Sequence, residues 1–519
     1  MERSGALARL GEAYDVLVVG GGATGLGVAV DAAARGYRTL VVEGRDFAQG
    51  TSSRSTKLVH GGVRYLQQGN VGLVREALHE RGLLLRNAPH LARELCFLLP
   101  AYKWWERPFY GLGLALYDLL AGSLKLTPTR VVDARTAVAL APTIRQAGLQ
   151  GGVLYSDAQF DDARLAIILA RTARERGAAL LNYAPVRALL KTAGRVSGAV
   201  VADEVGGGEH AVRARVVVNA TGVFSDTIRR MDDPAAEEII AVSQGIHLVL
   251  DRSFLPGETA ILVPHTDDGR VIFIIPWQGR ALVGTTDTPM LAPTVEPTAL
   301  ASEVAYVLEH AGRYLAKRPT PADVLSVFAG LRPLVQGKGG RTATLSRDHA
   351  LLLSDAGLVT IAGGKWTTYR RMAQDTVDLA AKAAGLPARP CLTASLRLYG
   401  ADGPHGRWRE FGATPGEIAA YEARYPGELH PNLPYSLAMA AYVIEREMAV
   451  KVEDVLSRRL RALILDARAA LAVAPRVAHL MAALQGHDAA WERSELAAFR
   501  ALASRYMVEQ SEAEVTADG

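Results

Sequence analysis

The chain contains 519 residues, of which 49% are hydrophobic and 22% charged, and its 58 basic side chains nearly balance its 54 acidic ones. A chain of this length is expected to fold as two or three domains, and the balanced charge gives no reason to expect nucleic acid as a partner, because such binding usually needs a concentrated basic face. Two cysteines, Cys96 and Cys391, exclude a disulfide framework and a cysteine-rich metal site, and they fit a reducing compartment.

The first predicted elements are a strand, a glycine-rich turn, a helix and a second strand. Residues 14–19 are apolar and rich in β-branched side chains, which is typical of a buried parallel strand. The sequence GGGATG follows at 20–25, residues 26–35 have helical character, and the apolar run 39–42 ends in Glu43. This order is that of the β–α–β unit that binds dinucleotides.

The residues of the turn have separate predicted tasks. Gly20 permits the tight turn, Gly22 lets the backbone approach a pyrophosphate, and Gly25 allows the helix to pack closely on the strand. The helix N-terminus presents free N–H groups to the phosphates, and the Glu43 carboxylate would accept hydrogen bonds from a ribose. The predicted cofactor contacts of this unit are Gly20, Gly21, Gly22, Thr24, Gly25 and Glu43.

A hydroxyl-rich loop begins eight residues beyond Glu43. Its serines and threonines suit contacts with the phosphates and ribose of a cofactor, although many such clusters are only turns. The closeness to Glu43 favours the cofactor, and the glycine-rich KLVHGG segment that follows fits the same role. The predicted contacts here are Thr51, Ser52, Ser53, Thr56, Lys57, Leu58, His60 and Gly62.

Two later segments favour FAD over NAD as the dinucleotide. Residues 215–222 (RVVVNATG) are a strand that ends in small residues, and residues 358–370 (LVTIAGGKWTTYR) are a strand, a glycine pair and the start of a helix, with Thr367 or Thr368 as its N-cap. The chain therefore returns twice to one sheet, whereas an NAD domain is normally contiguous. The predicted contacts are Ala220, Thr221, Gly222, Gly364, Lys365, Trp366 and Thr367.

The remaining regions complete the predicted domain plan. Short β-like runs in 96–150 and 240–335 predict a mixed sheet, with a meander over 260–285, and the region beyond 390 has helical periodicity. We predict an α/β fold with a Rossmann-like FAD-binding domain (1–95, 151–239 and 336–386), a mixed β-sheet substrate domain (96–150 and 240–335) and a C-terminal helical cap domain (387–519).

The segment GTSSRSTKLVHGGVRYL at 50–66, together with the glycine turn, Glu43 and GGKWTTYR, resembles the FAD-dependent glycerol-3-phosphate dehydrogenases of the D-amino-acid-oxidase superfamily. Further matches are YSDAQFDDAR (155–164), FIIPWQGRALVGTTD (273–287) and AGLRPL (329–334), in family order over residues 14–375. The resemblance implies a tightly bound FAD, transfer of the C2 hydrogen of sn-glycerol 3-phosphate to flavin N5, release of dihydroxyacetone phosphate, and electron transfer to a membrane quinone.

Oxidising a secondary alcohol beside a phosphate requires cations for the dianion. Arg64 and Tyr65 follow a glycine pair, where a side chain can reach the flavin edge, and Arg332 is held extended by the following proline. The planar, bidentate fork of an arginine suits phosphate or alkoxide. Arg370 could complete the anion pocket, although a surface charge is an equally good interpretation of this residue.

The same reaction requires a base. His247 stands inside the apolar run IHLVL (246–250), where a core histidine is the plain interpretation, but in the resembling family a histidine at this place faces the substrate. We therefore propose His247 as the general base, with His60 as the rival, since the loop around His60 fits FAD contact better. Lys365 precedes a helix and could face the flavin N1–C2=O end, where negative charge accumulates.

The sequence shows no metal-ligand spacing, and Asp161 and Asp162 are interpreted as a pair at a helix N-terminus. No segment is long and apolar enough to span a bilayer, and residues 1–13 lack a secretory signal, so membrane association is expected to be peripheral. Residues 103–125 combine tryptophans, basic residues and an apolar stretch, which suits either an interfacial anchor or a core helix. We expect a cytoplasmic enzyme, peripheral on the cytoplasmic membrane.

The alternatives left open are a glycerol-3-phosphate oxidase with oxygen as acceptor, an amine or 2-hydroxy-acid oxidase of the same superfamily, and a non-catalytic FAD-binding protein. The oxidases carry an inserted segment that has no obvious counterpart in this chain. The expected partners are glycerol 3-phosphate, a quinone, the membrane surface and no nucleic acid, and a homodimer is one expected assembly.

Overall fold

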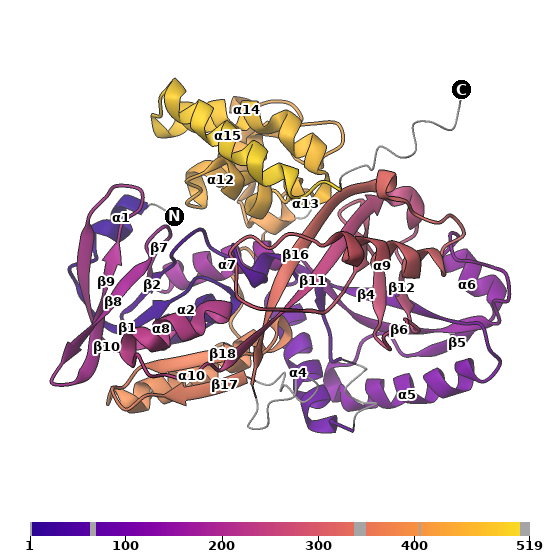
Figure 1. Cartoon of the computed structure of the whole chain (residues 1–519), viewed down its shortest axis with the longest axis horizontal. Helices are drawn as coiled ribbons and strands as arrows, with labels where there is room; N and C mark the ends of the chain where they lie inside the picture. Colours follow the sequence, from indigo (N-terminus) through magenta and orange to yellow (C-terminus); the bar gives the residue numbers. More distant parts are fainter. Residues whose placement is uncertain (1–2, 63–68, 337–348, 404–405, 509–519) are drawn as a thin grey trace.

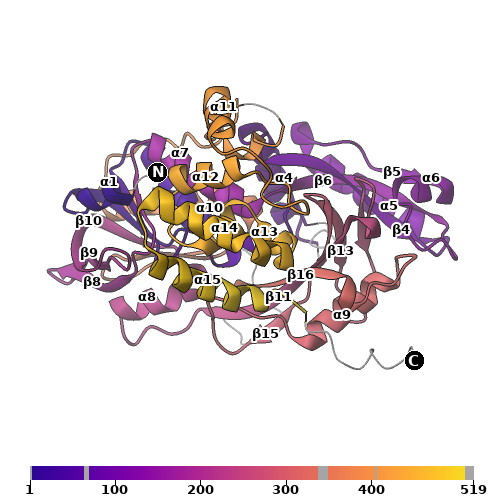
Figure 2. The same cartoon turned by 90° about the horizontal axis from the view of Figure 1, so that it is seen from above.

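The computed structural model describes residues 3–62, 69–336, 349–403 and 406–508. It contains two large sheets lying side by side, with a group of C-terminal helices on top of both (Figures 1 and 2). The predicted α/β fold with a C-terminal helical domain is confirmed.

The first sheet is the predicted nucleotide-binding sheet, assembled from three distant parts of the chain. In order across the sheet its strands are β17 (His349–Leu353), β18 (Val359–Gly363), β10 (Glu209–Asn219), β1 (Ala13–Val19), β2 (Thr39–Val42) and β7 (Ala179–Leu181), and the hairpin β8 (Val186–Thr192) and β9 (Arg195–Ala202) extends β10. The strands from β18 to β7 are parallel, so their carboxyl ends share one edge.

The side chains of β1 explain how this sheet is covered on both faces. Val16 and Val18 pack into a core with helices α2 (Ala23–Ala34), α7 (Asp162–Glu175) and α10 (Tyr369–Ala383). Leu17 and Val19 pack into a second core, with α1 (Arg3–Ala8), α8 (Ser225–Asp232) and the β8–β9 hairpin. Alternate residues of a strand point to opposite faces, so a continuous apolar run is what a doubly covered strand needs.

The second sheet carries the predicted meander. Its strands, in order, are β15 (Thr288–Met290), β11 (Ile240–Asp251), β14 (Arg280–Gly284), β13 (Ile272–Trp277), β12 (Ala260–Val263), β4 (Ala92–Ala101), β6 (Gly151–Phe160) and β3 (Leu58–Val59); β16 (Val324–Val335) pairs with β11, and β5 (Arg130–Val132) with β6. The long antiparallel pair β11–β16 places Ser243 opposite Arg332, and His247 opposite Phe328.

Two expectations about the second sheet and the region 96–150 are wrong. The boundary expected between residues 150 and 151 cuts this sheet, because β6 pairs along its whole length with β4. The region 96–150 is less β-like than expected. After β4 it contains the helices α5 (Glu106–Leu120) and α6 (Ala134–Leu140) and the short strand β5. Helices α4 (Val71–Asn87) and α9 (Ala301–Gly312) also pack against the second sheet.

The C-terminal region is helical, as predicted. Its helices are α11 (Pro415–Arg424), α12 (Leu437–Arg446), a π-helical turn (Asp454–Arg459), α13 (Ala462–Leu465), α14 (Ala467–Gln485) and α15 (Ala489–Ser504). The helical periodicity of this region does not give one continuous helix over 454–485, because the chain is interrupted at Arg461, whose backbone is left-handed with φ of 61°. By length and composition α14 could cross a membrane, but half of it is buried and it packs against α12, α13 and α15, so we assign it to the core of this domain.

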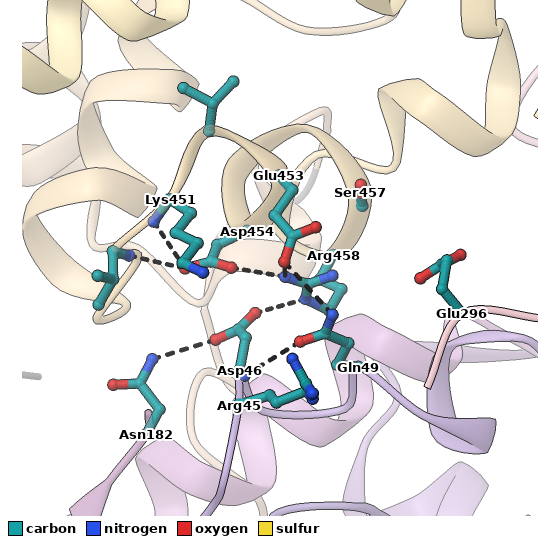
Figure 3. Close-up of polar contacts among 12 residues, drawn as sticks. Arg45, Asp46, Gln49, Asn182, Glu296, Lys451, Glu453, Asp454, Ser457 and Arg458 are labelled. Carbon is teal, nitrogen blue, oxygen red and sulfur yellow. Dashed lines mark hydrogen bonds and ion pairs between the residues drawn. The ribbon is translucent and has the colours of Figure 1, made fainter. Parts of the chain in front are cut away.

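Buried ion pairs fasten the C-terminal domain to the nucleotide half (Figure 3). The Arg458 guanidinium lies 2.5 Å from Asp46 Oδ2 and 2.5 Å from Asp454 Oδ1, and Asn182 donates to Asp46 from the other side at 3.2 Å. A buried charge is costly unless it is paired, so these contacts depend on the domain being docked. The nearby residues Arg45 and Gln49 line a cavity between the two sheets.

Candidate active site

A cavity of about 720 Å³ lies between the two sheets. One wall is the carboxyl edge of the first sheet, where β1, β2, β10 and β18 end, and the opposite wall comes from β11 and β16. Ligands of open parallel sheets bind at this edge. The predicted residues that line the cavity are Gly20, Gly22, Thr24, Glu43, Thr51, Ser52, Thr56, Leu58, His60, Ala220, Thr221, Gly222, His247, Arg332, Gly364, Lys365, Trp366 and Thr367.

The glycine turn is built as the motif predicts. Gly20 has φ of 112°, and a Cβ there would lie 2.5 Å from the Ala220 carbonyl oxygen. A Cβ on Gly25 would lie 1.9 Å from the Gly20 carbonyl oxygen, which confirms its task in packing the helix on the strand. Glu43 accepts hydrogen bonds from the backbone N–H groups of Gly21 (2.6 Å) and Arg45 (2.9 Å), and burial raises the pKa of its carboxyl.

The loop at 51–60 closes over this turn. Ser52 Oγ accepts from the Ala23 N–H at 2.8 Å, and the Trp366 indole donates to the Ser52 carbonyl at 3.1 Å. The His60 backbone exchanges hydrogen bonds with Thr367 Oγ1, at 3.3 and 3.2 Å. The loop and the GGKWTT segment therefore hold one another, as neighbours on the cavity wall.

His247 is 2% exposed and forms part of the cavity wall on β11. Its ring stacks on Phe328 of β16 at a centroid distance of 5.0 Å, and its Nε2 lies 2.9 Å from Thr56 Oγ1. No group in the described part of the chain reaches its Nδ1. Burial, the Lys57 ammonium and the Arg332 guanidinium hold the pKa of His247 well below its usual range, so the imidazole is neutral at pH 7.

Arg332 lies in the same wall, on β16. Its Nη1 contacts the Gln244 carbonyl (3.3 Å) and Asp287 Oδ1 (3.2 Å), and its Nη2 donates to the Thr286 carbonyl (2.9 Å). A Cβ on Gly245 would lie 2.2 Å from Nη2, so a glycine is needed to leave room for the guanidinium. The side chain remains 29% exposed, which suits a cation that is anchored yet open to an anion.

Family comparisons now bear on this geometry. A model for FAD-dependent oxidoreductases matches residues 15–370, and one for the C-terminal domain of alpha-glycerophosphate oxidase matches residues 408–492. Mitochondrial glycerol-3-phosphate dehydrogenase of Bos taurus is 41% identical over 524 residues, covering 93% of this chain and 71% of that protein. The chain belongs to the glycerol-3-phosphate dehydrogenase family of FAD-dependent oxidoreductases.

Two further relatives cover nearly the whole chain. Glycerol-3-phosphate dehydrogenase of Mycobacterium leprae (strain TN) is 39% identical, covering all of this chain and 93% of that protein. The crystal structure of glycerol-3-phosphate dehydrogenase from Bacillus halodurans, complexed with FAD, superposes with a TM-score of 0.80 at 29% identity, covering 98% of this chain and 99% of that one. The predicted cofactor, FAD, is therefore confirmed, and the glycine turn and carboxyl edge described above fit it.

Several predicted site residues of this glycerol-3-phosphate dehydrogenase family member do not line the cavity. Arg370 was expected to complete the anion pocket, but its guanidinium forms a buried bidentate pair with Glu80, at 2.7 and 2.6 Å, and lies outside the cavity wall. Arg64 and Tyr65 lie outside the described residues. The other predicted contacts that are not in the wall are Gly21, Gly25, Ser53, Lys57 and Gly62.

Lys57 has a role different from the one expected, and its partner Asp162 makes contacts beyond those expected. The Lys57 ammonium was expected to contact the cofactor, but it is fully buried and lies 2.7 Å from Asp162 Oδ2. Asp161 is the N-cap of α7, as expected of the pair. Asp162, the first residue of α7, also lies at the helix N-terminus as expected, and in addition it accepts hydrogen bonds from Ser55 and Arg461. These are contacts across more than 100 residues of sequence, which a local pattern does not reveal.

Other functional residues were missed by sequence reasoning. Arg54 lines the cavity and pairs with Glu296 at 2.5 Å, and Asp287 orients Arg332 while contacting Arg270 at 3.3 Å. A Cβ on Gly284 would lie 2.3 Å from the His247 ring, so this glycine leaves room for the proposed base. Gly284 and Asp287 both belong to the GTTD run at the end of β14, whose glycine, hydroxyl and acidic side chains were the signal available in the sequence. Within the described ranges, no group of three or more His, Cys, Asp or Glu side chains could hold a metal ion.

Proposed function

We propose that this flavoprotein oxidises sn-glycerol 3-phosphate at C2 to dihydroxyacetone phosphate and passes the electrons to a membrane quinone. One observation carries the proposal: a neutral, buried histidine and an anchored, partly exposed arginine stand on paired strands in the wall of the FAD cavity. The names of the relatives supply the substrate, and the two side chains supply the chemistry that it needs.

The neutral and the positively charged residues of the cavity wall have different tasks in this reaction. Neutral His247 accepts the hydroxyl proton of C2, directly or through Thr56 Oγ1, which also lines the cavity. Arg332 binds the phosphate or the developing alkoxide, because Gln244, Thr286 and Asp287 hold its planar fork in place. Lys365 stands in the wall beside the glycine pair and adds a second cation. FAD, when bound, supplies the two-electron acceptor.

The test is anaerobic bleaching of the flavin. Adding glycerol 3-phosphate to the oxidised holoenzyme should bleach the visible flavin absorption, whereas glycerol at the same concentration should do so far more slowly, because it lacks the anion for Arg332. Equal bleaching by both would rule out a phosphate site. Reoxidation then separates the acceptors: a water-soluble quinone should restore the colour quickly, and fast reoxidation by oxygen alone would favour the oxidase that the C-terminal domain match also permits.

We also propose that α5 and the turn before it contact a lipid bilayer. Trp104, Leu112 and Leu119 are 81%, 79% and 75% exposed, and Phe109 and Leu116 are exposed between them, while Leu114 and Tyr117 anchor the opposite side of the helix. An isolated exposed leucine is ordinary, but a row of them beside tryptophans is typical of an interfacial helix. Lys103 and Lys125 flank the helix and suit anionic headgroups. This surface supports the peripheral membrane location and access to quinone.

A further inference from the structure

The side chain of Arg461, in the C-terminal domain, contacts the loop 51–57, which forms part of the cavity wall. Arg461 is fully buried, and its Nη2 lies 2.7 Å from the Ser53 carbonyl oxygen and 3.0 Å from Asp162 Oδ1. The Lys57 ammonium, from the loop itself, contacts the same two groups, at 2.8 Å from the Ser53 carbonyl and 2.7 Å from Asp162 Oδ2. Two cations from distant parts of the chain therefore share one carboxylate and one loop carbonyl.

The backbone at both cations needs these contacts. Lys57 and Arg461 have φ of 62° and 61°, the left-handed region that residues other than glycine rarely adopt. A lysine and an arginine hold such a conformation when their side-chain ends are fixed by the surrounding structure. The shared contacts thus fix the path of the loop from Ser53 to Lys57.

This loop carries side chains of the reaction site. Thr56, next to Lys57, contacts His247 Nε2 at 2.9 Å, and Thr51 donates to the Leu331 carbonyl beside Arg332 at 2.6 Å. The Lys57 ammonium also lies 5.0 Å from the centre of the Phe328 ring, and that ring stacks on His247. A displacement of the buried Lys57, Arg461 and Asp162 side chains would therefore be transmitted to His247 both through Thr56 and through the Phe328 ring.

We propose that Arg461 is a positioning residue of the active site, through which the C-terminal domain holds loop 51–57 and, by way of Thr56, the His247 imidazole. The role rests on the proposed function, in which His247 accepts the substrate proton. It assigns a task in the reaction to a domain none of whose described residues lines the cavity.

The charge of Arg461 should also affect the pKa of His247. Lys57 and Arg461 face Asp162, and Asp161, which also interacts with Arg164 and Glu410, lies 3.5 Å from Arg461 Nε. His247 is faced by Lys57 and Arg332. Removing the Arg461 charge leaves a more negative cluster behind His247, which raises the pKa of the imidazole and moves the acid limb of flavin reduction to higher pH.

The experiment compares three holoenzyme variants in anaerobic stopped-flow reduction by glycerol 3-phosphate. Arg461→Met should keep its flavin and bind substrate within about threefold of wild type, because Arg332 is untouched, yet its limiting reduction rate should fall about 10–100-fold and its acid limb should move up. Arg461→Lys should recover part of the rate, since an ammonium can still reach one acceptor. The control is Arg171→Met, which breaks buried contacts of α7 with Phe411 and Tyr442 of the C-terminal domain and should lower the melting temperature without changing rate or acid limb.

Three outcomes decide the matter. Wild-type rate and acid limb in Arg461→Met would overturn the proposal and leave Arg461 as a fastening between domains. If Arg461→Met does not fold, Thr56→Val breaks the link to His247 without touching the buried charges, and a wild-type rate in that variant would overturn the proposal equally. A wild-type flavin that glycerol 3-phosphate does not bleach would instead refute the proposed function.

Discussion

His247 combines a place in the cavity wall with burial and two neighbouring cations, and this combination sets its chemistry. A histidine in water would lose activity as a base below about pH 6.5. Here the charged form is disfavoured by burial first, then by Lys57 and Arg332, so the pKa lies lower. Activity that depends on neutral His247 should therefore rise with pH through a range more acidic than that of an ordinary histidine.

This placement leads to a direct prediction. His247→Ala should slow anaerobic flavin reduction by about 10²–10⁴-fold, the usual effect of losing a general base, and should keep the flavin bound. The wild-type rate should hold down to below pH 6.5 and then fall, and the variant should lack that fall. His60→Ala is the matched comparison: it should weaken FAD retention and spare the rate of the flavin that remains. The reverse pattern would make His60 the base.

The contacts of some site residues could be predicted from the sequence, and those of others could not. Gly20, Gly25 and Glu43 act within one β–α–β unit, so local spacing was enough to predict their contacts. Arg370 was misjudged because its partner, Glu80, lies 290 residues away and nothing near Arg370 indicates it. Asp287 was passed over for a similar reason, since its value appears only when β11 and β16 bring Arg332 to it.

At the scale of elements, the apolar runs predicted β1, β2, β10 and β18 of the first sheet and the meander β12–β14 of the second, but not the hairpin β8–β9 or the long strand β6, and they did not reveal which strands pair. The apolar runs at 246–250 and 324–328 read as strands, yet nothing local indicates that β11 and β16 pair antiparallel and so bring His247 and Arg332 into one wall. In 96–150 the helix α5 agrees with the core-helix interpretation of residues 103–125, whereas α6 was missed, because a short apolar run satisfies the preferences of strands and buried helices alike.

Helix α5 carries the prediction that belongs to this scale. Leu112→Ser combined with Leu119→Ser should reduce cosedimentation with vesicles of mixed neutral and anionic phospholipid by about tenfold, because two side chains would no longer be buried in the acyl boundary. Reduction of flavin by glycerol 3-phosphate should be unchanged. Leu291→Ser, which removes a fully exposed leucine outside α5, should bind vesicles like wild type. Equal binding by all three proteins would refute the lipid contact.

At the scale of the whole molecule, three parts meet at one amide. The Gln278 side chain, in the turn between β13 and β14, donates to Asp161 at 3.1 Å and to Glu410 at 3.4 Å, and Tyr435 donates to its oxygen at 2.8 Å. Burial and the negative charge of Asp161 raise the pKa of Glu410 to about 7. The stability that protonated Glu410 contributes is full below its unfolded pKa near 4.5 and is lost as pH rises through 7.

Glu410→Gln should therefore melt at a higher temperature than wild type at pH 8, by an amount corresponding to about 1–2 kcal/mol, and the difference should close towards pH 5. Differential scanning fluorimetry of the holoenzyme across this range measures it. Glu428→Gln, which alters an exposed carboxylate paired with Arg407, should show no such pH dependence. A gain at Glu410 that is equal at both pH values would place its cause outside titration.

The central strands of the first sheet also constrain how the protein is made. β1 needs β10 as a neighbour, and β10 needs β18, with Val218 opposite Val359. A ribosome must therefore release well over half of the chain before the dinucleotide edge can exist, and Arg461 arrives later still. Such sequence-distant pairing slows folding, because a long loop must close before any contact rewards it. The nascent chain consequently leaves one edge of β1 unpaired until β10 has been made, and one edge of β10 unpaired until β18 follows, so the complete dinucleotide-binding edge forms only late in synthesis.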